Sequence, residues 1–142
     1  MEDKDLIAAK LESLMRCVRR IESKRPANVA VLEQDLDAQD ILAVNIERAV
    51  QLCVDICLHW LSARGLAVPA SMAETFSVVA NVDLLPADLA ARLSKAVGFR
   101  NIAVHQYEKI NWSIVHSIAW ERLDDFRKFS GYIAAAIQGE HA

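Results

Sequence analysis

The chain has 142 residues, of which 54% are hydrophobic and 25% charged, with four glycines, three prolines and a formal net charge of −3. Because this length is typical of one domain, we expect residues 1–142 to form a single domain, and the composition excludes collagen-like, low-complexity and intrinsically disordered chains. The excess of 19 acidic over 16 basic residues disfavours a broad nucleic-acid-binding surface but allows a local one.

The first predicted helix ends before Pro26. Apolar residues recur along it at steps of four and three, which places them on one stripe. The stripe consists of Ile7, Leu11, Leu14, Val18 and Ile21. The opposite face is basic and carries Arg16, Arg20 and Lys24, with Arg19 and Arg25 beside them.

The second predicted helix begins near Asp37 or Asp40, either of which can cap its free N–H groups, and runs to about Arg64 before Gly65. One apolar stripe follows its whole length, and further apolar residues leave it few exposed sides. The stripe consists of Leu42, Ile46, Ala49, Cys53, Ile56 and Trp60. We therefore expect this helix to be the central and most buried one.

Two helices are predicted in the middle of the chain. Ser71, followed three residues later by Glu74, is typical of a capping box and predicts a shorter helix through about Ala80. Pro86 suits the first turn of a fourth helix, which leads into Gly98.

The last predicted helix starts near Asn111 or Ser113. Its apolar stripe consists of Val115, Ile118, Phe126, Phe129, Ile133 and Ile137. No alternating strand pattern competes with these helices. The predicted fold class is therefore all-α, an antiparallel bundle of four main helices plus one short helix. The amount of apolar surface also favours a two-fold dimer.

Neither a membrane span nor a secretory signal is predicted. Charged and polar residues interrupt the longest mostly apolar stretch, residues 49–68, so it lacks the roughly 20 apolar residues that a membrane helix needs. The first five residues are acidic and continue into an amphipathic pattern, unlike a secretory signal. The three cysteines have no framework spacing and fit reduced thiols. We therefore expect a cytoplasmic protein.

No metal or other cofactor is expected. The sequence contains no Gly-rich phosphate loop, nucleophile elbow, His-Glu-x-x-His motif or Cys-x-x-Cys pair. Cys53 and Cys57 share a helix face, but His59 lies about 160 to 200° away from them, and structural zinc needs four ligands. We interpret the two cysteines as buried core thiols, and His116 and His141 as solvated residues.

Four polar side chains with complementary chemistry stand just after Gly98, namely Arg100, Asn101, His105 and Tyr107. A guanidinium binds phosphate through two parallel hydrogen bonds, and a histidine exchanges protons near neutral pH. The set suits RNA cleavage without a metal: His105 would withdraw the 2′-hydroxyl proton, Arg100 would stabilise charge on the phosphate, and Asn101 would orient either group. The alternative is a plain helix end whose arginine pairs with an acid and whose tyrosine is half buried.

The geometry of a straight helix keeps these side chains apart. Arg100 and Tyr107 would lie within about 20° of each other, whereas His105 would lie about 140° from Arg100. The three can converge if the helix is distorted near residue 105, or if a two-fold dimer brings two copies together.

The spacing of Arg100, His105 and Tyr107 resembles the motif of the HEPN superfamily, in the Arg-x4-His-x-Tyr form typical of HepT toxins. The similarity extends over nearly the whole chain. It includes Arg16-Cys17-Val18-Arg19-Arg20-Ile21, Gln39-Asp40, Glu47-Arg48, Cys53-Val54-Asp55, Phe76 and Leu123-Asp125-Phe126. The resemblance implies a HEPN-like bundle and a homodimer in which two motifs face a shared cleft.

This resemblance also implies an activity and a partner. Such proteins are RNase toxins of toxin–antitoxin pairs, so the chain is expected to be a metal-independent endoribonuclease with Arg100 and His105 as catalytic residues. Their antitoxin, MntA, is a minimal nucleotidyltransferase that binds the toxin and transfers AMP from ATP to the motif tyrosine, here Tyr107. The basic row Arg16, Arg20 and Lys24 is a candidate RNA contact, with a solvated helix face as its alternative.

Two other functions remain open at this stage. One is a non-catalytic HEPN module that binds a partner nucleotidyltransferase and presents a substrate or nucleotide to it. The other is a structural dimerisation domain without a ligand. The sequence favours the enzyme, because a pure scaffold would not need Arg100, His105 and Tyr107 together.

Overall fold

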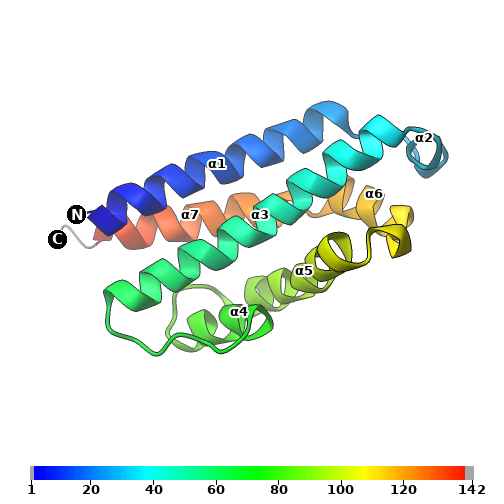
Figure 1. Cartoon of the computed structure of the whole chain (residues 1–142). Helices are drawn as coiled ribbons and strands as arrows, with labels where there is room; N and C mark the ends of the chain where they lie inside the picture. Colours follow the sequence, from blue (N-terminus) through cyan, green and yellow to red (C-terminus); the bar gives the residue numbers. More distant parts are fainter. Residues whose placement is uncertain (1, 140–142) are drawn as a thin grey trace.

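The computed structural model describes residues 2–139, and all regular structure in this part of the chain is helical, which confirms the all-α prediction. Figure 1 shows the helices Glu2–Lys24, Leu36–Ala63 and Leu123–Gly139 running side by side, with the start of the first and the end of the last at the same end of the bundle. The elements are α1 (Glu2–Lys24), α2 (Val29–Gln34), α3 (Leu36–Ala63), α4 (Met72–Asn81), α5 (Ala87–His105), the 3-10 helix η1 (Tyr107–Lys109), α6 (Trp112–Glu121) and α7 (Leu123–Gly139).

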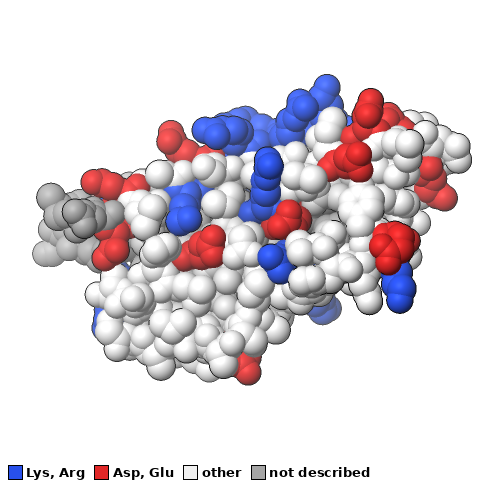
Figure 2. Space-filling view, viewed as in Figure 1, with Lys and Arg blue, Asp and Glu red and all other residues white. Residues whose placement is uncertain are grey.

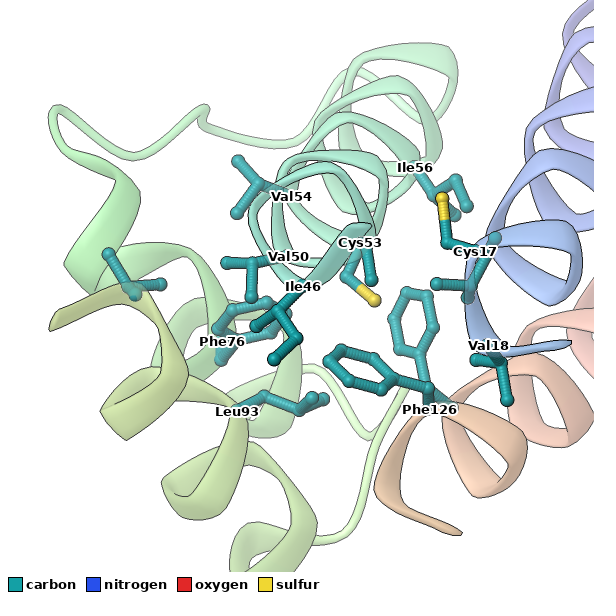
Figure 3. Packing of buried hydrophobic residues seen from close by; sticks show 14 of the residues in the cluster. Cys17, Val18, Ile46, Val50, Cys53, Val54, Ile56, Phe76, Leu93 and Phe126 are labelled. Carbon is teal, nitrogen blue, oxygen red and sulfur yellow. The ribbon is translucent and has the colours of Figure 1, made fainter. Parts of the chain in front are cut away.

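Helix α3 is the centre of the bundle, as predicted. It contacts each of the other α-helices. Buried residues recur along its length from Ala38 to Leu61. Figure 3 shows Cys53 of α3 pointing into the same core as Phe76 of α4, Leu93 of α5 and Phe126 of α7. The buried apolar side chains of the described residues form one continuous cluster, in which dense packing fixes the helices relative to one another.

The cysteines are core thiols, as the sequence predicted. Cys53 and Cys57 are fully buried in this cluster, and Cys17 is also buried. Burial raises the pKa of Cys53 and of Cys57 well above the usual range of a thiol, so both stay protonated. Within residues 2–139, no three His, Cys, Asp or Glu side chains are grouped so as to hold a metal ion.

The junction of α2 and α3 differs from the expectation. Helix α2 was not predicted, because six residues are too few to show an amphipathic period; Asn28 caps it by accepting a hydrogen bond from Val31 N at 2.9 Å. Asp35, rather than Asp37 or Asp40, caps α3, since its side chain accepts from Ala38 N at 3.1 Å.

Two further predictions of local structure were wrong. Ser71 is the N-cap residue of α4, but its side chain makes no capping hydrogen bond, so the capping box does not form. The last predicted helix is two helices, α6 and α7, separated at Arg122, although its apolar stripe continues through both.

His116 is half-buried rather than solvated. Its Nε2 lies 3.2 Å from the carbonyl oxygen of Pro26, which also accepts a hydrogen bond from Trp120 Nε1 at 2.8 Å. The guanidinium of Arg25 lies over the Trp120 ring, 3.8 Å from its centroid. These contacts attach the end of α1 to α6. His141 lies outside the described residues.

Charge is unevenly distributed over the surface. Figure 2 shows Lys and Arg side chains gathered along α1, whereas the surface over α4 carries few charges. Within the described residues, no helix is both long enough and apolar enough to cross a membrane.

Candidate active site

The motif residues follow one another along the end of α5. Gly98 does not end this helix, which continues to His105, where Gln106 adopts non-helical backbone angles. Tyr107 therefore stands on the separate turn η1 rather than on a straight continuation of α5. The helix is thus interrupted near residue 105, which is one of the two ways in which the motif side chains were expected to be able to converge. Arg100, His105 and Tyr107 nevertheless make no hydrogen bond or ion pair with one another in the part of the chain described.

A salt bridge between α5 and α7 holds the motif helix in place. Arg92 Nε donates to Asp125 Oδ1 at 2.8 Å, and Asp125 is buried. The side chain of Arg92 also lies 3.6 Å from Asp88 Oδ2, one turn earlier on α5. Because Asp125 is buried, loss of Arg92 would leave its charge without compensation, so this contact helps to hold α5 against α7.

Arg100 is partly buried, and most of its guanidinium N–H groups have no hydrogen-bond partner among the described residues. Its Nη1 donates to Asn101 Oδ1 at 3.3 Å, and its Nε is buried without a hydrogen-bond partner among the described residues. No carboxylate within that part of the chain forms an ion pair with it, so the alternative of an arginine paired with an acid is wrong. A guanidinium in this state can bind an anion through several charge-assisted hydrogen bonds.

His105 is exposed at the last position of α5. No hydrogen bond to another described residue holds its imidazole. Both ring nitrogens can therefore meet a ligand that approaches from solvent.

Tyr107 has a specific partner on α3. Its hydroxyl donates a hydrogen bond to the carboxylate of Asp40, and its ring contacts Trp112 edge-on, with 5.9 Å between the centroids. Partial burial, followed by the hydrogen bond to Asp40 and the charge of Asp40, raises the pKa of Tyr107 to about 12. The phenol therefore stays protonated at neutral pH.

Asp40 was not predicted as a site residue. The sequence indicated only that it might cap a helix and that it belongs to the Gln39-Asp40 pair of the resemblance. It stands 67 residues before Tyr107, so only the packing of α3 against the end of α5 brings the two together.

A groove between α1 and α3 gathers part of the basic row. Arg16 and Arg20 of α1 line it together with Arg48 of α3, and its volume is about 570 Å³. Glu47 and Asp55 also line this groove. Lys24 is exposed further along α1 and is outside the groove. The sequence indicated Arg48 only as part of the Glu47-Arg48 pair of the resemblance and not as a candidate RNA contact.

Comparison with known proteins identifies relatives over most of the chain. The family model described as "Ribonuclease HepT-like" matches residues 14–133. The mRNA nuclease HepT of Shewanella oneidensis is 34% identical over 131 residues, which cover 92% of this chain and 98% of that protein.

Two solved structures with similar sequences have the same fold. A tri-AMPylated Shewanella oneidensis HEPN toxin in complex with an MNT antitoxin is 34% identical, with a TM-score of 0.86 over 92% of this chain and 98% of that one. A toxin–antitoxin complex with AMP-PNP contains a chain that is 33% identical, also with a TM-score of 0.86 and the same coverage.

Proposed function

The chain belongs to the HepT-like ribonuclease family, and from this premise we propose that it is the RNase toxin of a HEPN/MNT toxin–antitoxin pair. The observation that carries the proposal is the complete motif at the end of α5, with an exposed His105 and an Arg100 that has no carboxylate partner among the described residues. Cellular RNA as substrate and ATP as the antitoxin's nucleotide source would locate this activity in the cytoplasm.

The proposed reaction needs only groups of the RNA and of the motif, together with water. His105 takes the proton of the 2′-hydroxyl, whose oxygen attacks the adjacent phosphorus while the bond to the 5′-oxygen breaks, and the departing 5′-oxygen takes up a proton from water. Arg100 stabilises the charge that develops on the phosphate, and Asn101 orients Arg100 through the hydrogen bond between their side chains. The expected products are a 2′,3′-cyclic phosphate and a 5′-hydroxyl.

The chemistry of the cut ends tests this proposal. We expect the purified chain to cleave RNA in the presence of EDTA, to leave 2′,3′-cyclic phosphate ends, and to spare an RNA with a 2′-deoxy sugar at the cleavage position. Mass spectrometry of the products distinguishes the ends. Cleavage that requires added Mg²⁺ or leaves 3′-hydroxyl ends would contradict the mechanism. A parent chain that cuts no RNA but accepts AMP would favour the non-catalytic module.

A homodimer is part of the proposal. Exposed apolar side chains stand on both helices that carry the site, Val44 on α3 and Ile102 and Val104 on α5. A two-fold axis through this region would cover them and would bring two copies of Arg100 to one cleft. The local positive charge would then be doubled without a change in the composition of the chain.

The proposed antitoxin is a minimal nucleotidyltransferase of the MntA type. It would transfer AMP from ATP to Tyr107, whose hydroxyl is at the surface beside the motif. A tri-AMPylated relative in complex with its MNT antitoxin supports this part of the proposal. The added phosphodiester is negatively charged and bulky, so it would compete with the substrate phosphate for Arg100.

The groove between α1 and α3 is a proposed contact for the RNA backbone, with Lys24 further along α1 as an additional contact. We expect Arg48→Gln, in a His105→Ala background that does not cut, to weaken RNA binding at low salt. The slope of log affinity against log salt should fall by about 0.7 for one lost phosphate contact with a single strand. Fluorescence anisotropy at several salt concentrations measures this slope.

Lys128→Gln is the matched control for that experiment, because Lys128 is an exposed cation on α7, away from the groove. The control should retain the slope of the His105→Ala protein. Equal slopes for Arg48→Gln and the control would show that Arg48 makes no contact with the RNA backbone and would contradict the groove as an RNA contact.

A further inference from the structure

The hydrogen bond between Tyr107 and Asp40 joins two well-anchored segments. Asp40 follows Gln39, which is buried and whose side-chain nitrogen donates to Leu32 O at 3.0 Å and Glu33 O at 3.2 Å. On the other side, the Trp112 ring supports Tyr107, and the 3-10 turn closes with a hydrogen bond from Ile110 N to Tyr107 O at 3.1 Å. Neither Tyr107 nor Asp40 therefore has to be ordered when a nucleotidyltransferase binds.

The direction of this bond sets the orientation of the phenol oxygen. A tyrosine hydroxyl has one hydrogen, and here that hydrogen points to the Asp40 carboxylate. The lone pairs of the oxygen therefore point away from Asp40. Since the Tyr107 side chain is 39% exposed, an electrophile can approach them from solvent.

A phenol in this environment does not ionise by itself. With a pKa of about 12, only about one molecule in 10⁵ is a phenolate at pH 7. An attack by the hydroxyl therefore needs a group that takes its proton as the new bond forms, and such a base must be within hydrogen-bond reach. Among the described residues, Asp40 is the group that meets this requirement.

We propose that Asp40 orients the Tyr107 hydroxyl and accepts its proton during nucleotidyl transfer, which rests on the proposed modification of this tyrosine. The phenol oxygen attacks the α-phosphorus of ATP, and the new O–P bond forms as the bond to pyrophosphate breaks. Pyrophosphate leaves with the electron pair, and the phenolic proton passes to Asp40. Protein kinases use an aspartate in the same way on the hydroxyl of their substrates.

Other charged groups on the adjoining elements do not take this role. Asp37 is on the first turn of α3, His105 ends α5, and Glu108 and Lys109 follow Tyr107 in η1. None of these four side chains forms a hydrogen bond with the Tyr107 hydroxyl. Asp37 is therefore a matched control, because it is an exposed carboxylate on the same helix end.

The test compares Asp40→Asn with Asp37→Asn in the full chain, incubated with its partner nucleotidyltransferase and labelled ATP. An asparagine oxygen can still accept the hydrogen bond of the phenol but is not a base. We expect transfer to Asp40→Asn to be about 10²-fold slower at pH 7. The deficit should shrink about tenfold for each pH unit as phenolate replaces the missing base. Asp37→Asn should match the parent at every pH.

A titration without the partner checks the contact itself. The phenolate absorbance of Tyr107, obtained by difference from Tyr107→Phe, should titrate at a lower pH in Asp40→Asn than in the parent, because a charge next to the phenolate is removed. An unchanged titration would show that the contact does not exist in solution and would overturn the inference.

Each outcome of the transfer experiment is decisive. Transfer to Asp40→Asn at the parent rate, or with a deficit that is the same at every pH, would overturn the role of Asp40 while leaving the modification of Tyr107 intact. A parent chain that takes up no AMP would instead overturn the proposed modification, and the role of Asp40 with it.

Discussion

His105→Ala is expected to slow RNA cleavage by about 10³-fold, and Arg100→Ala by about 10² to 10³-fold. The first change removes the proposed general base, whose contribution is typically about 10² to 10⁴-fold. The second removes donors from the developing charge on the phosphate, which typically costs about 10² to 10³-fold. The increases in activation free energy caused by the two substitutions should not add in the double variant, because both residues act on the same transition state. Single-turnover cleavage of a labelled RNA measures each rate.

Two substitutions of the same residue types control for charge and folding. His59→Gln changes a partly buried histidine on α3, and Arg122→Ala removes an exposed arginine between α6 and α7. Both should cleave RNA at nearly the parent rate. Cleavage by His105→Ala or Arg100→Ala as fast as by these controls would show that the motif is not the catalytic site.

Tyr107→Phe is expected to abolish AMP incorporation, because it removes the hydroxyl that attacks the nucleotide. The chain has two tyrosines, and the second, Tyr132 on α7, provides the control. Their exposed fractions are 39% for Tyr107 and 45% for Tyr132, so accessibility alone would not distinguish them. Intact-mass spectrometry after incubation with the nucleotidyltransferase and ATP should show added AMP on the parent and on Tyr132→Phe only.

Tyr107→Phe also has an expected effect in cells. A chain with Tyr107→Phe should remain toxic when the antitoxin is co-expressed, provided that modification rather than binding is what neutralises it. Equal AMP incorporation into Tyr107→Phe and the parent would place the modification elsewhere and would refute the assignment.

The net charge shows what composition can and cannot indicate about a nuclease. A value of −3 disfavours a broad basic surface, and on the face that Figure 2 shows the Lys and Arg side chains gather mainly along α1. The positive charge is local instead, in Arg100 at the end of α5 and in the arginines of the groove between α1 and α3. Composition averages over the whole surface, whereas a phosphate is bound by two or three side chains.

The sequence by itself determined the helices and the motif, because both depend on residues close together in the chain. The stripe Ile7, Leu11, Leu14, Val18 and Ile21 predicted α1, and the apolar sides of the second segment predicted the buried α3. A period of 3.6 residues is a local property, and so is the spacing of Arg100, His105 and Tyr107. The short α2 was not predicted because six residues show no amphipathic period, and the break at Arg122 was not predicted because the apolar stripe continues through it.

Only the tertiary structure decided which groups surround the motif. It placed Asp40 against a tyrosine 67 residues away, added Arg48 to the arginines of α1, and left Arg100 without a carboxylate partner in the described part of the chain. Such contacts depend on the angle and register at which whole helices pack. These are set by many buried side chains acting together, so no single stretch of sequence encodes them.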